Sequence, residues 1–148
     1  MESKMIKLSK EQIKDIAEEL DMGMSCYVHK TTGDATSIPA HVDEDDDNFE
    51  PWEDDFKKVE QNLDQYILIE TMHSSDSFKI MRKFLGKVAD PKLRDKLMIA
   101  ISQNKPFRRF RDILDYSGDV LQDWYQFKQE EMERYVERHL RDFSSEEE

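Results

Sequence analysis

The stretch Lys105–Phe127 constrains the fold of this chain more than any other, because apolar residues recur in it at helical spacing on both sides of a glycine. Apolar residues three and four positions apart form one face of a helix. We therefore predict two helices that meet at Gly118, a residue that readily adopts the positive φ of a helix end. The same spacing predicts that the core is anchored by Phe107, Phe110, Leu114, Trp124 and Phe127.

The N-terminal part predicts one helix followed by a β-hairpin. Ser9 and Gln12 have the spacing of a capping box, in which each side chain bonds the backbone N–H of the other residue at a helix start. The apolar period then changes to two over Met24–His29 and Ala35–Ile38, which is typical of strands. Between these strands, Gly33 supplies the positive φ that a tight turn requires.

A third strand is predicted at Tyr66–Met72, where β-branched and aromatic residues cluster. Helical spacing predicts a helix over residues 53–64, and every segment from Ser74 onward has a helical pattern. The predicted fold class is α+β, with a small three-stranded antiparallel sheet and an N-terminal helix, followed by a C-terminal bundle of about four helices. We expect one domain of residues 1–148, with an α/β part (1–73), a helical part (74–143) and an acidic tail (144–148).

Capping residues and prolines mark the boundaries of the C-terminal helices. Asp90 is a cap that is followed by Pro91 at the first helical position. Pro106 begins the next helix and keeps Lys105 out of the right-handed α region. Gly118 is expected to close that helix, and the last helix is predicted to follow it and to run to about residue 142.

Charge is unevenly distributed along the chain, whose net charge is −12. Residues 41–76 carry thirteen Asp/Glu against two lysines, whereas residues 79–111 carry eleven Lys/Arg against two aspartates. Two interpretations follow. Either the two stretches attract each other within one fold, or the basic stretch faces an anionic partner while the acidic stretch repels misplaced ones.

The acidic segment 43–55 is predicted to be a self-repelling loop rather than a metal site. Its aspartates alternate as in a calcium-binding loop, but the central glycine and the final glutamate of that motif are absent and Pro51 interrupts it. Phe49 and Trp52 lie within the segment. Either they dock on the fold, or they form an acidic and aromatic lure for a partner.

The sequence contains none of the common catalytic motifs, and it implies no cofactor. Cys26 is the only cysteine, and its strand pattern predicts a small buried hydrophobe rather than a nucleophile. His29 lies three positions from Cys26, which places the two side chains on opposite faces of a strand. The sequence therefore favours a binding protein over an enzyme. A hydrolase with His29 or His73 beside a carboxylate is a third alternative.

The basic cluster on the helix that begins at Pro106 is the best candidate for a site. Arg108 and Arg111 share one outward edge of this helix, while Arg109 points elsewhere. Each of the first two has an aspartate four positions on, and such exposed pairs are worth only ~0.2–0.5 kcal/mol. Alternatively, the cluster is part of a phosphate-binding strip. Its further members would be Arg82, Lys83, Lys87, Arg94 and Lys96.

Several segments of the chain occur together in the order typical of one protein family. They are Leu8–Met22 (LSKEQIKDIAEELDM) with Tyr27 and Lys30–Gly33, Tyr66–Leu85 (YILIETMHSSDSFKIMRKFL), Pro106–Leu114 (PFRRFRDIL) and Trp124–Phe127 (WYQF). By these segments the chain resembles the bacterial Uncharacterised Protein Family 0158. The resemblance covers most of the chain outside the acidic segment and the tail. It implies a shared fold and no particular activity.

The function predicted from the sequence is that of a small cytoplasmic interaction or adaptor protein without catalytic activity, which contacts an unknown protein partner. The alternative is binding of nucleic acid or another polyanion through the basic helical strip 79–111. A single cysteine, an N-terminus unlike a signal peptide and the lack of any run of about 18 apolar residues favour the cytoplasm over a membrane. The candidate binding residues are Arg108, Arg111, Arg82, Lys83, Lys87, Phe49 and Trp52.

Overall fold

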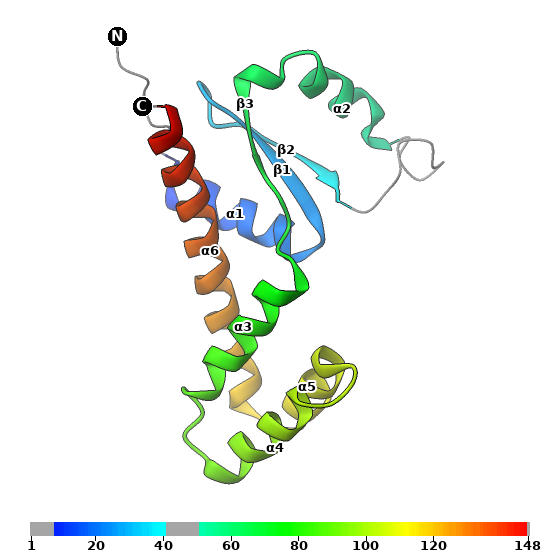
Figure 1. The fold of residues 1–148 in the computed structure, drawn as a ribbon, viewed down its shortest axis with the longest axis vertical. Coiled ribbons are helices and arrows are strands. Elements are labelled where there is room, and N and C mark those ends of the chain that lie inside the picture. The colour runs from blue at the N-terminus through cyan, green and yellow to red at the C-terminus, as the bar shows by residue number, and fades with distance from the viewer. Residues whose placement is uncertain (1–7, 41–50, 148) are drawn as a thin grey trace. The chain divides into compact units, whose positions relative to one another are not determined.

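The computed structural model describes residues 8–40 and 51–147, with side chains as far as Arg141. The described residues fall into two compact units. The first contains the residues up to Met72 together with those from Met132 onward, and the second is His73–Glu131. The elements in chain order are α1 (Lys10–Asp21), β1 (Met24–His29), β2 (Ala35–Pro39), α2 (Glu53–Glu60), a short 3₁₀ helix (Leu63–Gln65), β3 (Tyr66–Ile69), α3 (Ser74–Leu85), α4 (Pro91–Ile101), α5 (Pro106–Leu114) and α6 (Asp119–Glu147) (Figure 1). This arrangement confirms the predicted α+β fold class.

The first unit is built on a three-stranded antiparallel sheet with the strand order β2-β1-β3. Cys26 in the central strand lies opposite Ser37 on one side and Ile69 on the other. The third strand ends at Ile69, three residues before the predicted end. The chain leaves the sheet here, and the hydroxyl of Thr71 donates a hydrogen bond of 2.8 Å to the carbonyl of Leu20 at the end of α1.

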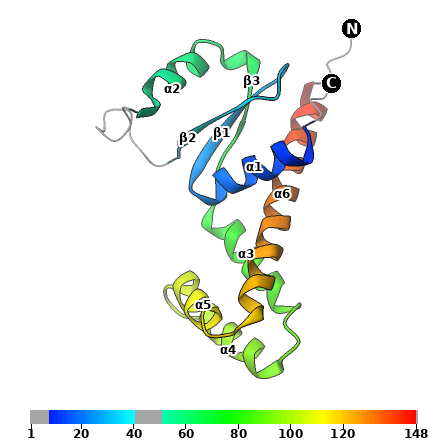
Figure 2. The same ribbon diagram turned by 180° about the vertical axis from the view of Figure 1, so that it is seen from behind.

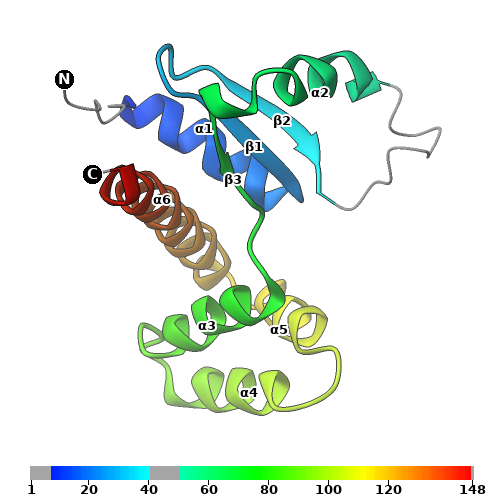
Figure 3. The same ribbon diagram turned by 45° about the horizontal axis from the view of Figure 1, so that its top comes forward.

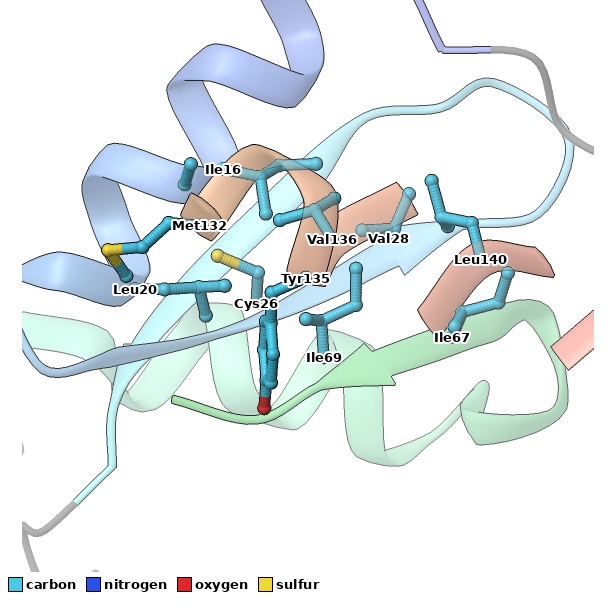
Figure 4. Packing of buried hydrophobic residues seen from close by; sticks show 11 residues of the cluster. Ile16, Leu20, Cys26, Val28, Ile67, Ile69, Met132, Tyr135, Val136 and Leu140 are labelled. Carbon is cyan, nitrogen blue, oxygen red and sulfur yellow. The ribbon is translucent and has the colours of Figure 1, made fainter. Parts of the chain in front are cut away.

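One face of this sheet carries the core of the first unit, which α1 and the second half of α6 cover. Figure 4 shows side chains from the helices and from β1 and β3 packed together. The buried members are Ile16, Ala17, Leu20, Cys26, Val28, Ile67, Ile69, Met132, Tyr135, Val136 and Leu140. The hydroxyl of Tyr135 donates a 2.9 Å hydrogen bond to the carbonyl of Glu70, which satisfies its polar group at the edge of this core.

Helix α2 contacts β2, and α1 and α2 lie on different sides of the strands (Figure 3). Ile38 points away from the face of Cys26 because side chains alternate along a strand, and both Ile38 and Val59 of α2 are buried. Helix α2 ends at Glu60, four residues earlier than predicted. Asn62 donates its side-chain amide to the carbonyl of Lys58, and the 3₁₀ helix follows.

The capping box at the start of α1 is confirmed. The backbone N–H of Ser9 donates to Oε1 of Gln12 at 2.8 Å, and the backbone N–H of Gln12 donates to Oγ of Ser9 at 3.1 Å. Two of the donors that a helix start leaves unpaired are thereby satisfied. Leu8 and Ile13, on either side of the cap, are partly buried against the core of the first unit.

Gly33 (φ 78°) and Gly23 (φ 88°) both have a positive φ. We expect an alanine to cost more stability at Gly33 than at Gly23. A Cβ at Gly33 would lie 3.0 Å from Cδ2 of Leu8 and 3.2 Å from Nε2 of Gln12, whereas a Cβ at Gly23 would meet nothing. We expect Gly23→Ala to lower the free energy of unfolding by about 1 kcal/mol through its φ alone. Gly33→Ala should cost about 1 kcal/mol more, because it also displaces the capping box. Urea denaturation of both variants measures this difference. Equal losses of unfolding free energy would contradict the close approach of Leu8 and Gln12 to Gly33.

The second unit contains α3, α4, α5 and the first half of α6, and its core is a cluster of aromatic rings. The ring of Phe84 lies with its centroid 5.3 Å from that of Trp124 and 6.4 Å from that of Phe110. Phe110 in turn lies 4.9 Å from Trp124. These contacts confirm Phe110 and Trp124 as core anchors, but Phe107 is 41% exposed and the prediction for it was wrong. Phe107 lies in the first turn of α5, whereas the buried side chains of this helix lie further along, at Phe110 and Leu114.

The helix boundaries were predicted with mixed success. Asp90 caps α4 as expected, since its carboxylate accepts a 3.0 Å hydrogen bond from the N–H of Lys92. Lys105 avoids the right-handed region and adopts a left-handed conformation (φ 51°, ψ 52°). Gly118 does not close α5, which ends at Leu114; it directly precedes α6 instead. Helix α6 runs to Glu147, beyond the predicted end, because no glycine or proline follows Gly118.

Candidate functional site

The basic side chains predicted to form a site all lie in the second unit. Arg82 and Lys83 are on α3, Lys87 follows α3, and Arg108 is on α5; each of these side chains is exposed. Phe49 lies outside the described residues. Trp52 directly precedes α2 in the first unit and is half-buried.

The arginines of α5 differ in what they contact. Arg111 donates to Asp115 at 3.2 Å, as predicted, and its guanidinium carbon lies 5.2 Å from the ring centroid of Tyr125. Within the described part of the chain, no salt bridge joins Arg108 to the aspartate four positions on. Arg109 donates from Nε to the backbone carbonyl of Asn104 at 2.7 Å and from Nη2 to its Oδ1 at 2.9 Å. Arg109 is therefore fixed to the turn before α5.

Part of the predicted strip has a structural role in the second unit. The ammonium of Lys83 lies 3.0 Å from the carboxylate of Glu131 and so joins α3 to α6. The two side chains differ in exposure, with Glu131 the more buried of the pair. Lys83 is therefore a weaker candidate for a binding residue than Arg82, Lys87 or Arg108.

A site that sequence reasoning missed lies between α4 and α5, two helices that pack against each other (Figure 2). An open hollow of about 340 Å³ separates their outer faces, and we call it the α4–α5 hollow. Its described lining residues are Lys96, Ile99, Ala100, Gln103, Arg109, Asp112 and Ile113. Ile99 is 59% exposed, and the adjacent Met98 is 51% exposed. The run Leu97–Ile101 (LMIAI) is apolar on every side of the helix, and this was the signal available in the sequence.

The surroundings of the α4–α5 hollow are basic. Residues 91–114 carry seven Lys/Arg and two aspartates. The whole second unit, His73–Glu131, carries twelve Lys/Arg and nine Asp/Glu, although the complete chain has a net charge of −12. Apolar lining residues within a basic surface suit a partner that brings both apolar and acidic groups.

A second hollow, of about 240 Å³, lies between α1 and the hairpin in the first unit. Its described lining residues are Gln12, Asp15, Ile16, Glu19, Gly33, Asp34, Ala35 and Ser37, and no histidine is among them. The described part of the chain contains no group of three or more His, Cys, Asp or Glu side chains that could hold a metal ion. This hollow therefore offers carboxylates without the histidine that the hydrolase alternative requires.

Cys26 lies within the sheet, fully buried as predicted. Its Sγ is 3.5 Å from Oγ of Ser37. Burial raises the pKa of the Cys26 thiol, and the nearby charge of Glu19 acts in the same direction, while the contact with Ser37 lowers it. A buried thiol with a raised pKa is a poor nucleophile at neutral pH, because the thiolate is the reactive form.

His29 has a structural role in the hairpin. Its Nδ1 accepts hydrogen bonds from the backbone N–H groups of Thr31 and Thr32, at 3.1 and 3.2 Å. Its ring packs edge-on against the ring of Tyr66, with centroids 5.1 Å apart. These contacts hold the turn that leads to Gly33.

Comparisons with known proteins agree with the resemblance seen in the sequence. The family model described as "Uncharacterised protein family (UPF0158)" matches residues 3–146, which confirms that resemblance. The chain is also similar to the UPF0158 protein PA5073 of Pseudomonas aeruginosa, with 29% identity over 78 residues. This match covers 53% of the chain and about half, 51%, of the relative. No solved structure matches the chain. Among the described helices, none combines the length and the apolar character that crossing a membrane requires.

Proposed function

Since the chain belongs to the uncharacterised protein family UPF0158, whose description assigns no reaction, we propose that it is a small interaction or adaptor protein without catalytic activity. In this proposal a protein partner binds to the second unit at the α4–α5 hollow. The observation that carries it is an exposed apolar surface, centred on Ile99, within a basic helix pair. Exposed apolar patches rimmed by polar groups often mark interaction sites.

The residues with catalytic potential support a binding role over an enzymatic one. Cys26 is buried and its raised pKa keeps the thiol protonated. His29 uses its Nδ1 atom to accept backbone hydrogen bonds. A cytoplasmic location is part of the proposal, because a lone cysteine held in the core as a thiol suits a reducing compartment.

The experiment compares two substitutions of exposed apolar residues. Ile99→Asp changes a residue of the α4–α5 hollow that is 59% exposed, and Leu63→Asp changes a residue of the first unit that is 55% exposed. We expect affinity capture from a bacterial lysate to return a discrete protein with the unchanged chain and with Leu63→Asp. Ile99→Asp should recover at least about tenfold less of it, which corresponds to about 1.4 kcal/mol of binding free energy.

Two results would count against the proposal. One is that the unchanged chain captures no discrete protein. The other is that Ile99→Asp and Leu63→Asp capture the same protein in equal amounts, since the partner would then bind elsewhere. Circular dichroism of both variants provides the control, because exposed positions should tolerate aspartate without loss of helix.

A second candidate function is polyanion binding by the strip 79–111. The exposure of Arg82, Lys87 and Arg108 supports this alternative, whereas the pairing of Lys83 with Glu131 and of Arg111 with Asp115 weakens it. If the strip neutralises phosphates, binding of a nucleic acid should weaken steeply with salt. Replacing Arg108 and Arg111 by alanine should then flatten the slope by about two, and salt-independent binding would exclude this function.

A further inference from the structure

The α4–α5 hollow has the geometry of a groove between two helices. On α4, Ile99 and Ala100 lie three and four positions after Lys96, so both are on the same side of the helix as Lys96. On α5, Arg109 and Ile113 are four positions apart and face the same hollow. The apolar lining residues are Ile99, Ala100 and Ile113, and the charged ones are Lys96, Arg109 and Asp112. A third helix fits such a surface because side chains at the same spacing can enter it.

Two cationic side chains, Arg109 and Lys96, are among the lining residues of the hollow. Arg109 is held by its two hydrogen bonds to Asn104, so less side-chain entropy is lost when its remaining N–H groups bind a partner. Lys96 is exposed on the other helix. Asp112 is the acidic residue among the described lining residues, and it would face a basic group of the partner. The overall preference is for a negatively charged partner.

The lining residues distinguish between possible anionic partners. Nucleic acids bind through phosphate–cation contacts and through stacking on aromatic rings, and no aromatic residue is among the described lining residues. The lining residues instead include the aliphatic side chains of Ile99 and Ile113. Burying them gains free energy only if the partner brings apolar side chains of its own. The backbone of α4 and α5 is bonded within the helices, so an added strand would find no edge here.

We infer that the α4–α5 hollow binds an acidic amphipathic helix of a partner protein, with aliphatic side chains against Ile99 and Ile113 and carboxylates near Lys96 and Arg109. This inference rests on the proposed function and specifies the chemistry of the partner. The basic side chains of the hollow favour a partner helix with an acidic face. The aliphatic lining residues favour a partner helix that also has an apolar face. The basic character of residues 91–114 should also accelerate association at low salt.

The test uses labelled synthetic peptides of about five helical turns and the full chain. The acidic probe has leucine at spacings of three and four and glutamate at most other positions. A matched basic probe has lysine in place of each glutamate, and a third probe keeps the glutamates but has alanine in place of each leucine. A single-stranded RNA of similar length serves as the alternative class of ligand. Fluorescence anisotropy gives the dissociation constant of each.

We expect the acidic leucine probe to bind at least about tenfold more tightly than the other two peptides and the RNA. Lys96→Glu should weaken its binding about tenfold and strengthen that of the basic probe. Ile99→Asp should weaken the acidic probe by at least the same factor, and Leu63→Asp should leave it unchanged. Lys96 and Ile99 are both exposed, so neither variant depends on repacking of the core.

The inference is overturned if the acidic leucine probe does not bind, if the acidic and basic probes bind equally, or if RNA binds as tightly as the acidic probe. It is also overturned if Leu63→Asp weakens binding as much as Ile99→Asp. Failure of the inference is distinguishable from failure of the proposed function. A protein captured by the unchanged chain and lost with Ile99→Asp would still support a protein site at the hollow, with a partner of different chemistry.

Discussion

Phe110→Ala should lower the free energy of unfolding of the second unit by about 3–5 kcal/mol, the range for removing a buried aromatic side chain. Phe110 is 1% exposed and its ring lies against those of Phe84 and Trp124. Removing it leaves a cavity in the aromatic cluster. Urea denaturation followed by tryptophan fluorescence measures the loss. A Trp52→Phe background makes Trp124 the reporter, because the chain has two tryptophans.

The matched control is Phe107→Ala, the other phenylalanine of the same FRRF sequence. Phe107 is 41% exposed, so its removal should cost no more than about 1 kcal/mol. Equal losses for the two variants would show that Phe107 is as much part of the core as Phe110. That result would contradict the packing of α5, in which Phe110 and Leu114 are the buried residues.

Val136→Asp should have a similarly large effect on the first unit. Val136 on α6 is fully buried in the core that α1, β1 and β3 share, and no charged side chain is buried among the described residues of this core. Burying an unpaired charge, or protonating it in place, should cost at least about 3 kcal/mol. Amide hydrogen exchange in β1 should therefore become at least about 100-fold faster, since each factor of ten corresponds to 1.4 kcal/mol.

Glu137→Asp is the control because it places the same residue one position further along α6. Glu137 is exposed, so this variant should change the exchange of β1 by less than about threefold. If amide exchange in β1 of the Val136→Asp variant stays as slow as in the unchanged chain, the second half of α6 does not cover the sheet. The assignment of Met132–Leu140 to the first unit would then be wrong.

Local signals in the sequence predicted much of the fold. The capping box of Ser9 and Gln12, the hairpin turn with Gly33 and the cap at Asp90 each depend on residues within a few positions of one another. Such signals can be recognised in a sequence because the hydrogen bonds that cause them are local. The three strands and the helices that follow them were predicted, apart from some of their ends, from the spacing of apolar residues, which is also a local signal.

Features set by distant contacts were not predictable in the same way. The sequence predicted the last helix, but it did not show that Tyr135 bonds the backbone of Glu70 or that Met132 and Leu140 pack on the sheet. The exposure of Phe107 was also missed, since helical spacing alone does not show which turns of a helix have neighbours.

The candidate site was only partly predictable. The basic character of the second unit was visible in the sequence, and Arg108 is exposed as expected. The α4–α5 hollow was not visible, because Ile99 of one helix and Ile113 of the next line it together only once the two helices have packed. The left-handed Lys105 and the Arg109–Asn104 contacts shape the turn that sets this packing.

The most direct measurement of the central claim is amide hydrogen exchange of the full chain with and without the captured protein partner. If the α4–α5 hollow is the binding surface, protection should increase within residues 96–113 and should remain unchanged in β1, β2 and β3. Protection confined to the first unit, with residues 96–113 unaffected, would contradict the claim.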